Sequence, residues 1–288
     1  MLGRVKDYVA LTKPRIVLLL VITAYCAMVV ARGAVPDWRV TVFTLGGLAL
    51  SAGGANAVNM WYDRDIDCVM ERTRNRPVPA GRLPARAALL FGISAQAVSL
   101  VMMTLTVGVL AALIALAGFL FYVLVYTMWL KRRTAQNIVI GGAAGAFPPL
   151  VGWAAVTHQV SLAPVLMFLI IFLWTPPHFW ALALYKQDDY RRANIPMMPL
   201  VQGEQSTKMQ ALGYTLLLML ASLLLYVTGV VGLIYLVAAV VLGLGFIVYG
   251  VALLVEQKPQ DRWARRTFQY SLVYMLVLFV AMVANARR

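Results

Sequence analysis

Charged residues are scarce in this sequence, and acidic ones are scarcer still. Asp, Glu, Lys and Arg make up 12% of the 288 residues, whereas 62% are hydrophobic. Soluble globular domains carry about twice that share of charge, so the sequence excludes that class. Several apolar runs reach the ~20 residues that a helix needs to cross a bilayer. We therefore expect an all-α, polytopic membrane protein whose main surroundings are the lipid bilayer.

Cysteine and long polar segments are also lacking. The two cysteines, Cys26 and Cys68, lie in an apolar run and beside a polar motif, so no disulfide framework is predicted. No tail, linker or low-complexity segment is long enough for a second domain, and we expect residues 1–288 to form a single transmembrane domain. No convincing cleavage site follows the first apolar run, so we expect this run to be retained as a span.

The apolar runs predict nine membrane spans, with boundaries defined to within several residues. The predicted spans are residues 15–32, 38–60, 87–107, 110–130, 137–156, 162–184, 209–229, 231–254 and 267–286. An eight-span alternative would fuse 209–254 differently. It would move the basic residues between Lys258 and Arg266 to the opposite side of the membrane.

The basic residues divide unevenly between the two sides of these spans. Only Arg32, Arg39, Arg287 and Arg288 of the 25 Lys and Arg fall on one side, and the other 21 lie on the side of the N-terminus. The positive-inside rule makes that side cytoplasmic, which predicts a multi-pass protein of the cell inner membrane. The net charge of +14 then reflects loops near anionic headgroups, and we expect no nucleic-acid partner.

Asn59, Asp63 and Asp67 recur every four residues at the end of the second span. On a helix this spacing forms one polar stripe, on which neighbouring carboxylates repel each other unless a cation lies between them. Mg²⁺ takes oxygen ligands, typically one or two carboxylates together with substrate phosphates. Arg72, Arg74 and Arg76 follow, so we predict a site for Mg²⁺ and a diphosphate. The alternative, a solvated helix with local salt bridges, does not explain why the few acids concentrate here.

A second polar cluster follows the sixth span as the first follows the second span. Tyr185 and Asp189 share one helical face, and Asp188 lies beside them. Lys186 and Arg191 could supply positive charge for a leaving diphosphate. Because both clusters lie on the same side of the membrane, we expect them to face each other across the bundle. The alternative is an ordinary charged loop.

His178 follows the paired prolines Pro176 and Pro177, which we expect to kink the sixth span. It precedes Tyr185 by seven residues, which is about 10 Å of helix and places both side chains on one face. Two interpretations stay open: a hydrogen-bonded packing residue, or a residue that contacts the substrate. The other histidine, His158, lies on the outer side and is expected to be incidental.

Runs of small residues interrupt two of the spans. Residues 53–55 precede Asn59, and residues 141–145 open the fifth span. Such runs favour close helix packing in bilayers, and they could also form a smooth wall for an apolar chain.

Four stretches resemble a known family. The segment NMWYDRDIDCVMERTRNRPVPAGR at 59–82 resembles the first aspartate-rich signature of the intramembrane UbiA-type prenyltransferases, which also share the nine-span pattern. Within that superfamily, residues 11–16, 137–157 and 173–203 are similar to the protoheme IX farnesyltransferases, or heme O synthases. The TPPHFWAL and IPMMP segments in 173–203 are the specific ones, and the first motif indicates only the superfamily.

The resemblance implies transfer of the farnesyl group of farnesyl diphosphate to a vinyl group of heme B, giving heme O, with Mg²⁺ as cofactor. It also implies an active site that opens to the cytoplasmic side. An allylic diphosphate ionises when its developing negative charge is neutralised. The expected catalytic residues and metal ligands are Asn59, Asp63, Asp67 and Asp189, with Asp188 as a further metal ligand. Diphosphate contacts are expected from Arg72, Arg76, Lys131, Lys186 and Arg191, and heme contact from His178.

The sequence departs from the family pattern at one position, and three alternative functions stay open. Many members of the superfamily carry a second Asp-x-x-x-Asp, whose first position here is Tyr185, so the number of Mg²⁺ ions stays open. The alternatives are a prenyltransferase for an aromatic or quinone acceptor, a transporter with acids at mid-membrane, and a non-catalytic oxidase assembly factor. Contact with heme A synthase or oxidase assembly proteins is a further expectation.

Overall fold

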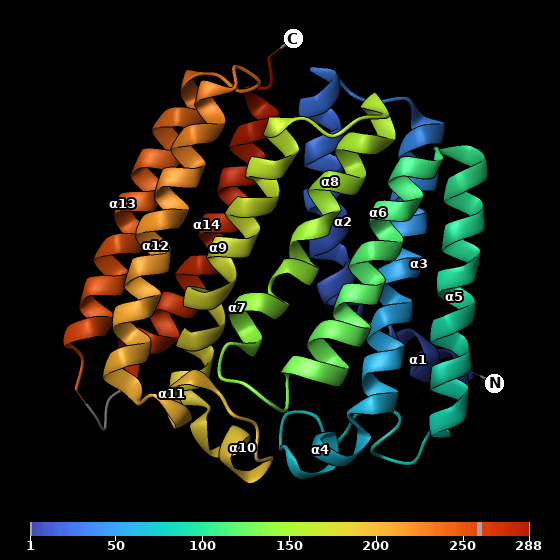
Figure 1. The fold of residues 1–288 in the computed structure, drawn as a ribbon, viewed down its shortest axis with the longest axis vertical. Coiled ribbons are helices and arrows are strands. Elements are labelled where there is room, and N and C mark those ends of the chain that lie inside the picture. The colour runs from blue at the N-terminus through green and yellow to red at the C-terminus, as the bar shows by residue number, and fades with distance from the viewer. Residues whose placement is uncertain (1, 258–260, 288) are drawn as a thin grey trace.

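The computed structural model describes residues 2–257 and 261–287, and these form a bundle of long helices (Figure 1). Within these ranges, nine helical segments are long and apolar enough to cross a membrane. They are α2 (Pro14–Arg32), α3 (Trp38–Tyr62), α5 (Ala85–Thr106), α6 (Val109–Leu120) continued by the π-helix η1 (Phe121–Leu130), α7 (Asn137–Gly141) continued by α8 (Ala143–Thr157), α9 (Leu162–Tyr185), α12 (Glu204–Val227), α13 (Leu233–Val255) and α14 (Arg262–Ala284).

The nine-span prediction is confirmed, and the largest differences from the predicted boundaries are at the starts of two spans. The seventh span begins at Glu204 and the ninth at Arg262, each five residues before its predicted start at 209 and 267. Both extensions consist largely of polar residues, because a helix can continue beyond the apolar layer where water and neighbouring loops satisfy its side chains. Hydropathy therefore predicts which residues lie in the apolar layer, but it does not predict where the helix begins or ends.

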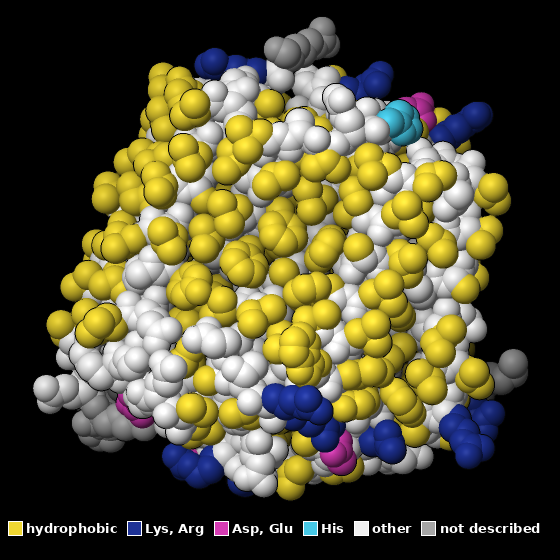
Figure 2. All heavy atoms as spheres, viewed as in Figure 1, with side chains coloured by type: hydrophobic (Ala, Val, Ile, Leu, Met, Phe, Trp, Pro, Cys, Tyr) yellow, Lys and Arg dark blue, Asp and Glu magenta, His cyan; other side chains and the backbone are white. Residues whose placement is uncertain are grey.

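The outer surface matches a protein that spans a bilayer. Figure 2 shows hydrophobic side chains covering the middle of the visible face, with Lys, Arg, Asp and Glu gathered towards its two ends. Leu105 and Val227, for example, are exposed large apolar residues. A soluble protein does not expose apolar surface on this scale, so the chain is a multi-pass membrane protein.

Short helices gather at one end of the bundle (Figure 1). They are α1 (Leu2–Leu11), α4 (Arg64–Val69), α10 (Gln187–Arg192) and α11 (Met198–Val201). The helix α4 carries part of the first acidic cluster and α10 carries the second. Both clusters therefore lie at the same end, as the loop arrangement predicts.

Small residues serve close packing at several positions in the bundle. A Cβ atom on Gly54 of α3 would lie 2.6 Å from the carbonyl oxygen of Gly92 on α5, and one on Gly53 would lie 3.1 Å from the Thr12 side chain. A Cβ atom on Gly141 would overlap the ring of Tyr126. These contacts favour the packing interpretation of both small-residue runs, although a Cβ atom on Gly145 would meet no other atom within 4 Å.

The helix α9 continues through Pro176 and Pro177 without ending. Thr175, just before them, donates a hydrogen bond from its hydroxyl to the Ile171 carbonyl at 2.8 Å. Proline removes backbone donors from a helix, but neighbouring helices and Thr side chains make it tolerable within membrane spans. The prolines therefore leave His178 within one long helix.

Candidate active site

The first acidic cluster lies where α3 passes into α4. The α3 helix ends at Tyr62 and α4 begins at Arg64, so Asp63 lies between them. The backbone N–H of Asp63 donates to the Asn59 carbonyl at 2.9 Å, and that of Asp67 donates to the Asp63 carbonyl at 2.8 Å. This pattern preserves the four-residue spacing across the junction. The predicted stripe of Asn59, Asp63 and Asp67 is present, and the three residues are only 3%, 0% and 1% exposed.

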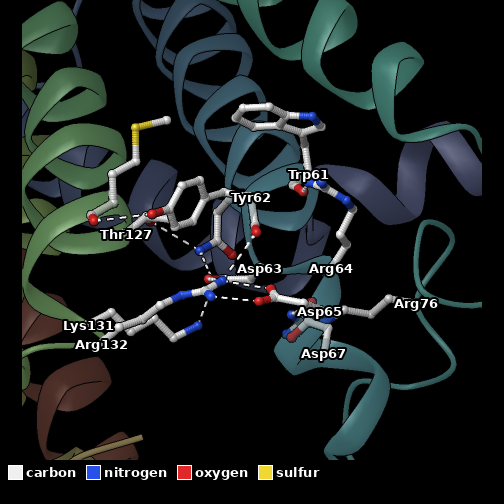
Figure 3. A network of polar contacts seen from close by, with 12 residues as sticks. Trp61, Tyr62, Asp63, Arg64, Asp65, Asp67, Arg76, Thr127, Lys131 and Arg132 are labelled. Carbon is white, nitrogen blue, oxygen red and sulfur yellow. Dashed lines mark hydrogen bonds and ion pairs between the residues drawn. The ribbon is translucent and has the colours of Figure 1, made fainter. Parts of the chain in front are cut away.

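Each buried carboxylate of the stripe has a basic partner, as Figure 3 shows. The ammonium Nζ of Lys131 lies 2.5 Å from Asp63 Oδ2, and Arg76 Nη1 lies 2.7 Å from Asp67 Oδ2. Asn59 donates from Nδ2 to Asp63 Oδ2 at 2.7 Å. Unpaired buried charges are costly, so these pairs explain how two acids can be enclosed here.

Asp65 lies outside the stripe, although it stands between Asp63 and Asp67 in sequence. Its side chain is largely exposed and receives two hydrogen bonds of 2.7 Å from Arg132. These bonds are the main reason why the pKa of Asp65 is lowered from its ordinary value. Arg132 also lies over the ring of Tyr62, with its Cζ atom 4.9 Å from the ring centre. Arg132 Nη2 also lies 3.4 Å from Asp63 Oδ1, so the pair of Asp65 and Arg132 borders the buried stripe and contacts it.

The second cluster meets the first through Asp189. Its Oδ1 atom accepts a hydrogen bond from the backbone N–H of Glu71 at 3.4 Å and one from Arg192 at 2.6 Å. Burial raises the pKa of Asp189, but Arg192, the Glu71 amide and nearby Lys186 outweigh burial and lower the pKa overall. The expected approach of the two acid-bearing helix ends is confirmed by this contact.

Three other predicted residues of the second cluster face away from this contact. The Asp188 side chain is 83% exposed and pairs with Arg191 at 2.7 Å, whereas the Asp189 side chain is 6% exposed. Lys186 is exposed at the junction of α9 and α10. Consecutive residues on a helix point about 100° apart, so α10 can turn only one of its two carboxylates inward.

Arg72 extends the basic side of the first cluster towards α10. It lies near Tyr190, whose pKa is raised by burial and lowered in part by the charge of this arginine. Arg72 is itself exposed. Because Arg72 is exposed at the edge of the first cluster, its guanidinium group is accessible to an anion that enters the site from solvent.

The sequence did not single out Lys13 or Thr127. Lys13 immediately precedes α2 and donates from Nζ to Asn59 Oδ1 at 2.8 Å. Burial, followed by the charges of Arg76 and Lys131, lowers its pKa well below the ordinary value. Thr127 lies on η1 and accepts a hydrogen bond from Asn59 Nδ2 at 3.1 Å. Lys13 belongs to the 11–16 segment that carries the resemblance, but a lysine before a span also has a topological explanation. No sequence signal marks Thr127.

His178 is a residue of α9, and its buried side chain faces α14. Its Nδ1 atom lies 2.6 Å from the Ser271 hydroxyl oxygen. The imidazole is stacked between Trp174 and Phe268, with ring centres 4.2 Å and 4.6 Å away. No hydrogen bond or ion pair joins it to the acidic clusters within the described ranges.

The model of the UbiA prenyltransferase family matches residues 20–273, most of the chain. The chain belongs to this family. A relative from Symbiobacterium thermophilum, named Protoheme IX farnesyltransferase, is 60% identical over 99% of this chain and 95% of its own length. Relatives of the same name from Trichodesmium erythraeum and Acidiphilium cryptum are 50% and 47% identical, over 98% and 97% of this chain and 86% and 90% of their own lengths.

Several solved structures share the fold of this chain. A structure from work on digeranylgeranylglyceryl phosphate synthase superposes with a TM-score of 0.82 at 18% identity, over 98% of both chains. A UbiA homologue from Archaeoglobus fulgidus bound to DMAPP and Mg²⁺ gives a TM-score of 0.65 at 16% identity, over 96% of this chain and 99% of its own. At these identities the likeness establishes the fold alone.

The donor atoms of this UbiA-family site fit a hard cation that arrives with a phosphate ligand. Among the residues that the structure describes, no three His, Cys, Asp or Glu side chains converge as a ready-made metal site. Asp63 and Asp67 nevertheless present buried carboxylate oxygens, and buried Asn59 adds one amide oxygen, which accepts a hydrogen bond from Lys13. Mg²⁺ typically binds through one or two carboxylates plus substrate phosphates and waters, so two carboxylates and an amide are an adequate set.

Proposed function

We propose that this chain transfers the farnesyl group of farnesyl diphosphate to a vinyl group of heme B and so forms heme O. The observation that carries the proposal is the 60% identity, over 99% of the chain, to a relative named Protoheme IX farnesyltransferase. Relatives that carry this name match along the chain and not only at the first acidic motif, which is the part typical of the whole superfamily. The geometry of the site supports the same chemistry.

The diphosphate end of the substrate would lie at the two acidic clusters. Asn59, Asp63 and Asp67, with Asp189 opposite, would hold Mg²⁺ together with the diphosphate. Bound Mg²⁺ supplies neutralisation of the negative charge that develops on the leaving diphosphate. Contacts to the phosphate oxygens would come first from Arg72, Arg76 and Lys131, which are already at the clusters. Lys186 and Arg191, being exposed, would contribute from the rim.

Lys131 and Arg76 would exchange partners when the substrate binds. In the structure they neutralise Asp63 and Asp67. A metal ion competes for these carboxylate oxygens, and a diphosphate brings phosphate oxygens that attract the released cations. The exchange would keep every buried charge paired, which avoids the several kcal/mol typical of an uncompensated buried ion. Mg²⁺ and diphosphate would therefore bind better together than either would alone.

The proposed reaction breaks the bond between farnesyl C1 and the diphosphate oxygen, and the diphosphate keeps the electron pair. The vinyl π electrons of heme B then form the new carbon–carbon bond to C1. Water adds to the resulting cation at the vinyl carbon next to the porphyrin ring, and the proton it releases goes to the diphosphate or to solvent. No protein nucleophile is required. The apolar helices protect the allylic cation from premature capture by water.

His178 would hold the heme. It lies at the inner part of α9, and a neutral imidazole can either bind iron or hydrogen-bond the porphyrin edge. The farnesyl chain would lie among the apolar spans, near the end of the bundle that carries the acids. With 21 of 25 Lys and Arg on that side, we place this end, the opening of the site and the N-terminus in the cytoplasm, and the protein in the cell inner membrane.

Purified protein in lipid nanodiscs tests the proposed function directly. The assay supplies farnesyl diphosphate, Mg²⁺ and reduced heme B, and mass spectrometry detects heme O, with Asp63→Ala as the inactive control. A parallel assay replaces heme with an aromatic quinone precursor. Heme O in the first assay supports the proposal. A prenylated product only in the second would overturn the choice of acceptor, and no product from folded protein in either would overturn the transferase activity.

A further inference from the structure

The contact between His178 and Ser271 determines which imidazole nitrogen carries the proton. Nδ1 of His178 on α9 lies 2.6 Å from the Ser271 hydroxyl oxygen on α14. The same hydroxyl donates a hydrogen bond to the Phe268 carbonyl, also at 2.6 Å. A serine hydroxyl has one proton to donate. Both contacts are therefore hydrogen bonds only in the tautomer in which Nδ1 carries a proton and donates it to the serine oxygen.

It follows that Nε2 of a neutral His178 carries a free lone pair. No side chain in the described part of the chain donates a hydrogen bond to Nε2, and no carboxylate hydrogen-bonds the ring to favour a charged imidazolium. The residue as a whole is 6% exposed, and Nε2 is not among the fully enclosed side-chain nitrogens of the described residues that lack a partner. Its lone pair is therefore the open acceptor of the ring.

Neighbouring aromatic rings fix the direction of this lone pair. Trp174 and Phe268 stack on the two faces of the imidazole, with interplanar angles of 18° and 24°. A ligand can therefore approach only in the plane of the ring, which is the direction of the Nε2 lone pair. Trp174 also donates from Nε1 to the Ser271 backbone carbonyl at 2.8 Å. Two hydrogen bonds thus hold α9 against α14 at the same residue.

We propose that Nε2 of His178 is an axial ligand of the iron of the heme acceptor, and that Ser271 is its positioning residue. This inference rests on the proposed function, because that function brings a heme to the protein. Histidines that bind metals almost always donate their other ring N–H to an oxygen, which fixes the tautomer and makes the ligating nitrogen more basic. The chain from Nδ1–H through the Ser271 hydroxyl to the Phe268 carbonyl is such an arrangement. It favours coordination of the iron over contact with the porphyrin edge.

Resonance Raman and absorption spectra of the purified protein with reduced heme B test the ligand directly. Wild type is expected to show an iron–histidine stretching band, and His178→Ala should lose it and regain an iron–imidazole band when imidazole is added. His178→Gln, which keeps a donor for Ser271, repeats the test in a variant closer in size. An unchanged band in either folded variant would overturn the assignment. Heme O formation is measured in parallel to keep the two proposals separate. If the variants form heme O and their iron–histidine band is unchanged, the ligand assignment is wrong but the proposed function stands.

Ser271→Ala tests the positioning role, with Trp174→Phe as the matched control. Ser271→Ala removes the acceptor of the Nδ1 proton, so the iron–histidine band should shift to lower frequency and heme affinity should fall ~10–100-fold. Ser271→Thr should restore both. Trp174→Phe removes the other hydrogen bond between α9 and α14 but keeps a ring on His178, so it should lower the melting temperature without moving the band. Equal band shifts in both variants, or none in Ser271→Ala, would overturn the positioning role.

Discussion

Lys131 Nζ lies 2.5 Å from Asp63 Oδ2, and the Asp63 side chain is fully buried. These two residues come from different helices, since Asp63 ends α3 and Lys131 follows η1. Their pairing places a cation where we propose that Mg²⁺ binds. Lys131 therefore neutralises Asp63, and a metal–diphosphate complex would have to replace Lys131 at this carboxylate.

Replacement of Asp63 or Asp67 by alanine should abolish farnesyl transfer. Either change removes a carboxylate at the position where charge develops in the reaction, an effect expected to be ~10²-fold or more. Asp65→Ala is the matched control, because it removes a carboxylate that lies two residues from both Asp63 and Asp67 but is itself exposed. The measurement is heme O yield per folded protein, with folding checked by thermal melting. Near-normal yield from Asp63→Ala or Asp67→Ala would end the metal–diphosphate assignment.

Activity should require a divalent cation and should prefer Mg²⁺, because the proposed ligands are all oxygens. A thermal-shift titration tests the partner exchange. Mg²⁺ alone should stabilise the protein little, since Lys131 and Arg76 occupy the carboxylates, and Mg²⁺ with inorganic diphosphate should stabilise it clearly. Full turnover in excess chelator would contradict the metal requirement. If Mg²⁺ alone raised the melting temperature as much as Mg²⁺ with diphosphate, the proposed exchange of partners by Lys131 and Arg76 would be wrong.

Asp189→Asn should reduce transfer much more than Asp188→Asn. Asp189 is buried and contacts the Glu71 amide of the first cluster, whereas Asp188 is exposed and bonded to Arg191. The pair is a close comparison, because the two changes are chemically identical and adjacent on α10. Initial rates at saturating farnesyl diphosphate are the measurement. A larger loss in Asp188→Asn would show that the other carboxylate faces the substrate.

Gly152→Ala should destabilise the protein, whereas Gly145→Ala on the same helix should not. A Cβ atom on Gly152 would overlap the backbone carbonyl of Ala24 on α2, whereas one on Gly145 would meet nothing within 4 Å. Overpacking against backbone typically costs about 1–3 kcal/mol, and alanine is otherwise the better helix former by about 1 kcal/mol. Melting temperatures in a common detergent compare the two. Equal melting temperatures would mean that α2 and α8 separate easily.

The number of spans, the end of the bundle where function is expected and the acidic stripe could all be predicted from the sequence. Hydropathy finds the spans because the bilayer requires ~20 apolar residues per helix. The spacing of Asn59, Asp63 and Asp67 finds the stripe because a helix repeats every 3.6 residues. Both properties are local, so they could be predicted from neighbouring residues alone. The resemblance then supplied the reaction, which no periodicity contains.

Which side chains meet depends on the packing of the helices, and the sequence does not show it. The sequence already ranked Asp189 above Asp188 through its spacing from Tyr185, but only the rotation of α10 against the 59–82 segment shows Asp189 buried there and Asp188 exposed. Lys13 reaches Asn59 across 46 positions, and Ser271 reaches His178 across 93. Such contacts depend on the packing of whole helices, where one position along a helix turns a side chain by about 100°. A pattern of neighbouring residues holds no information about that rotation.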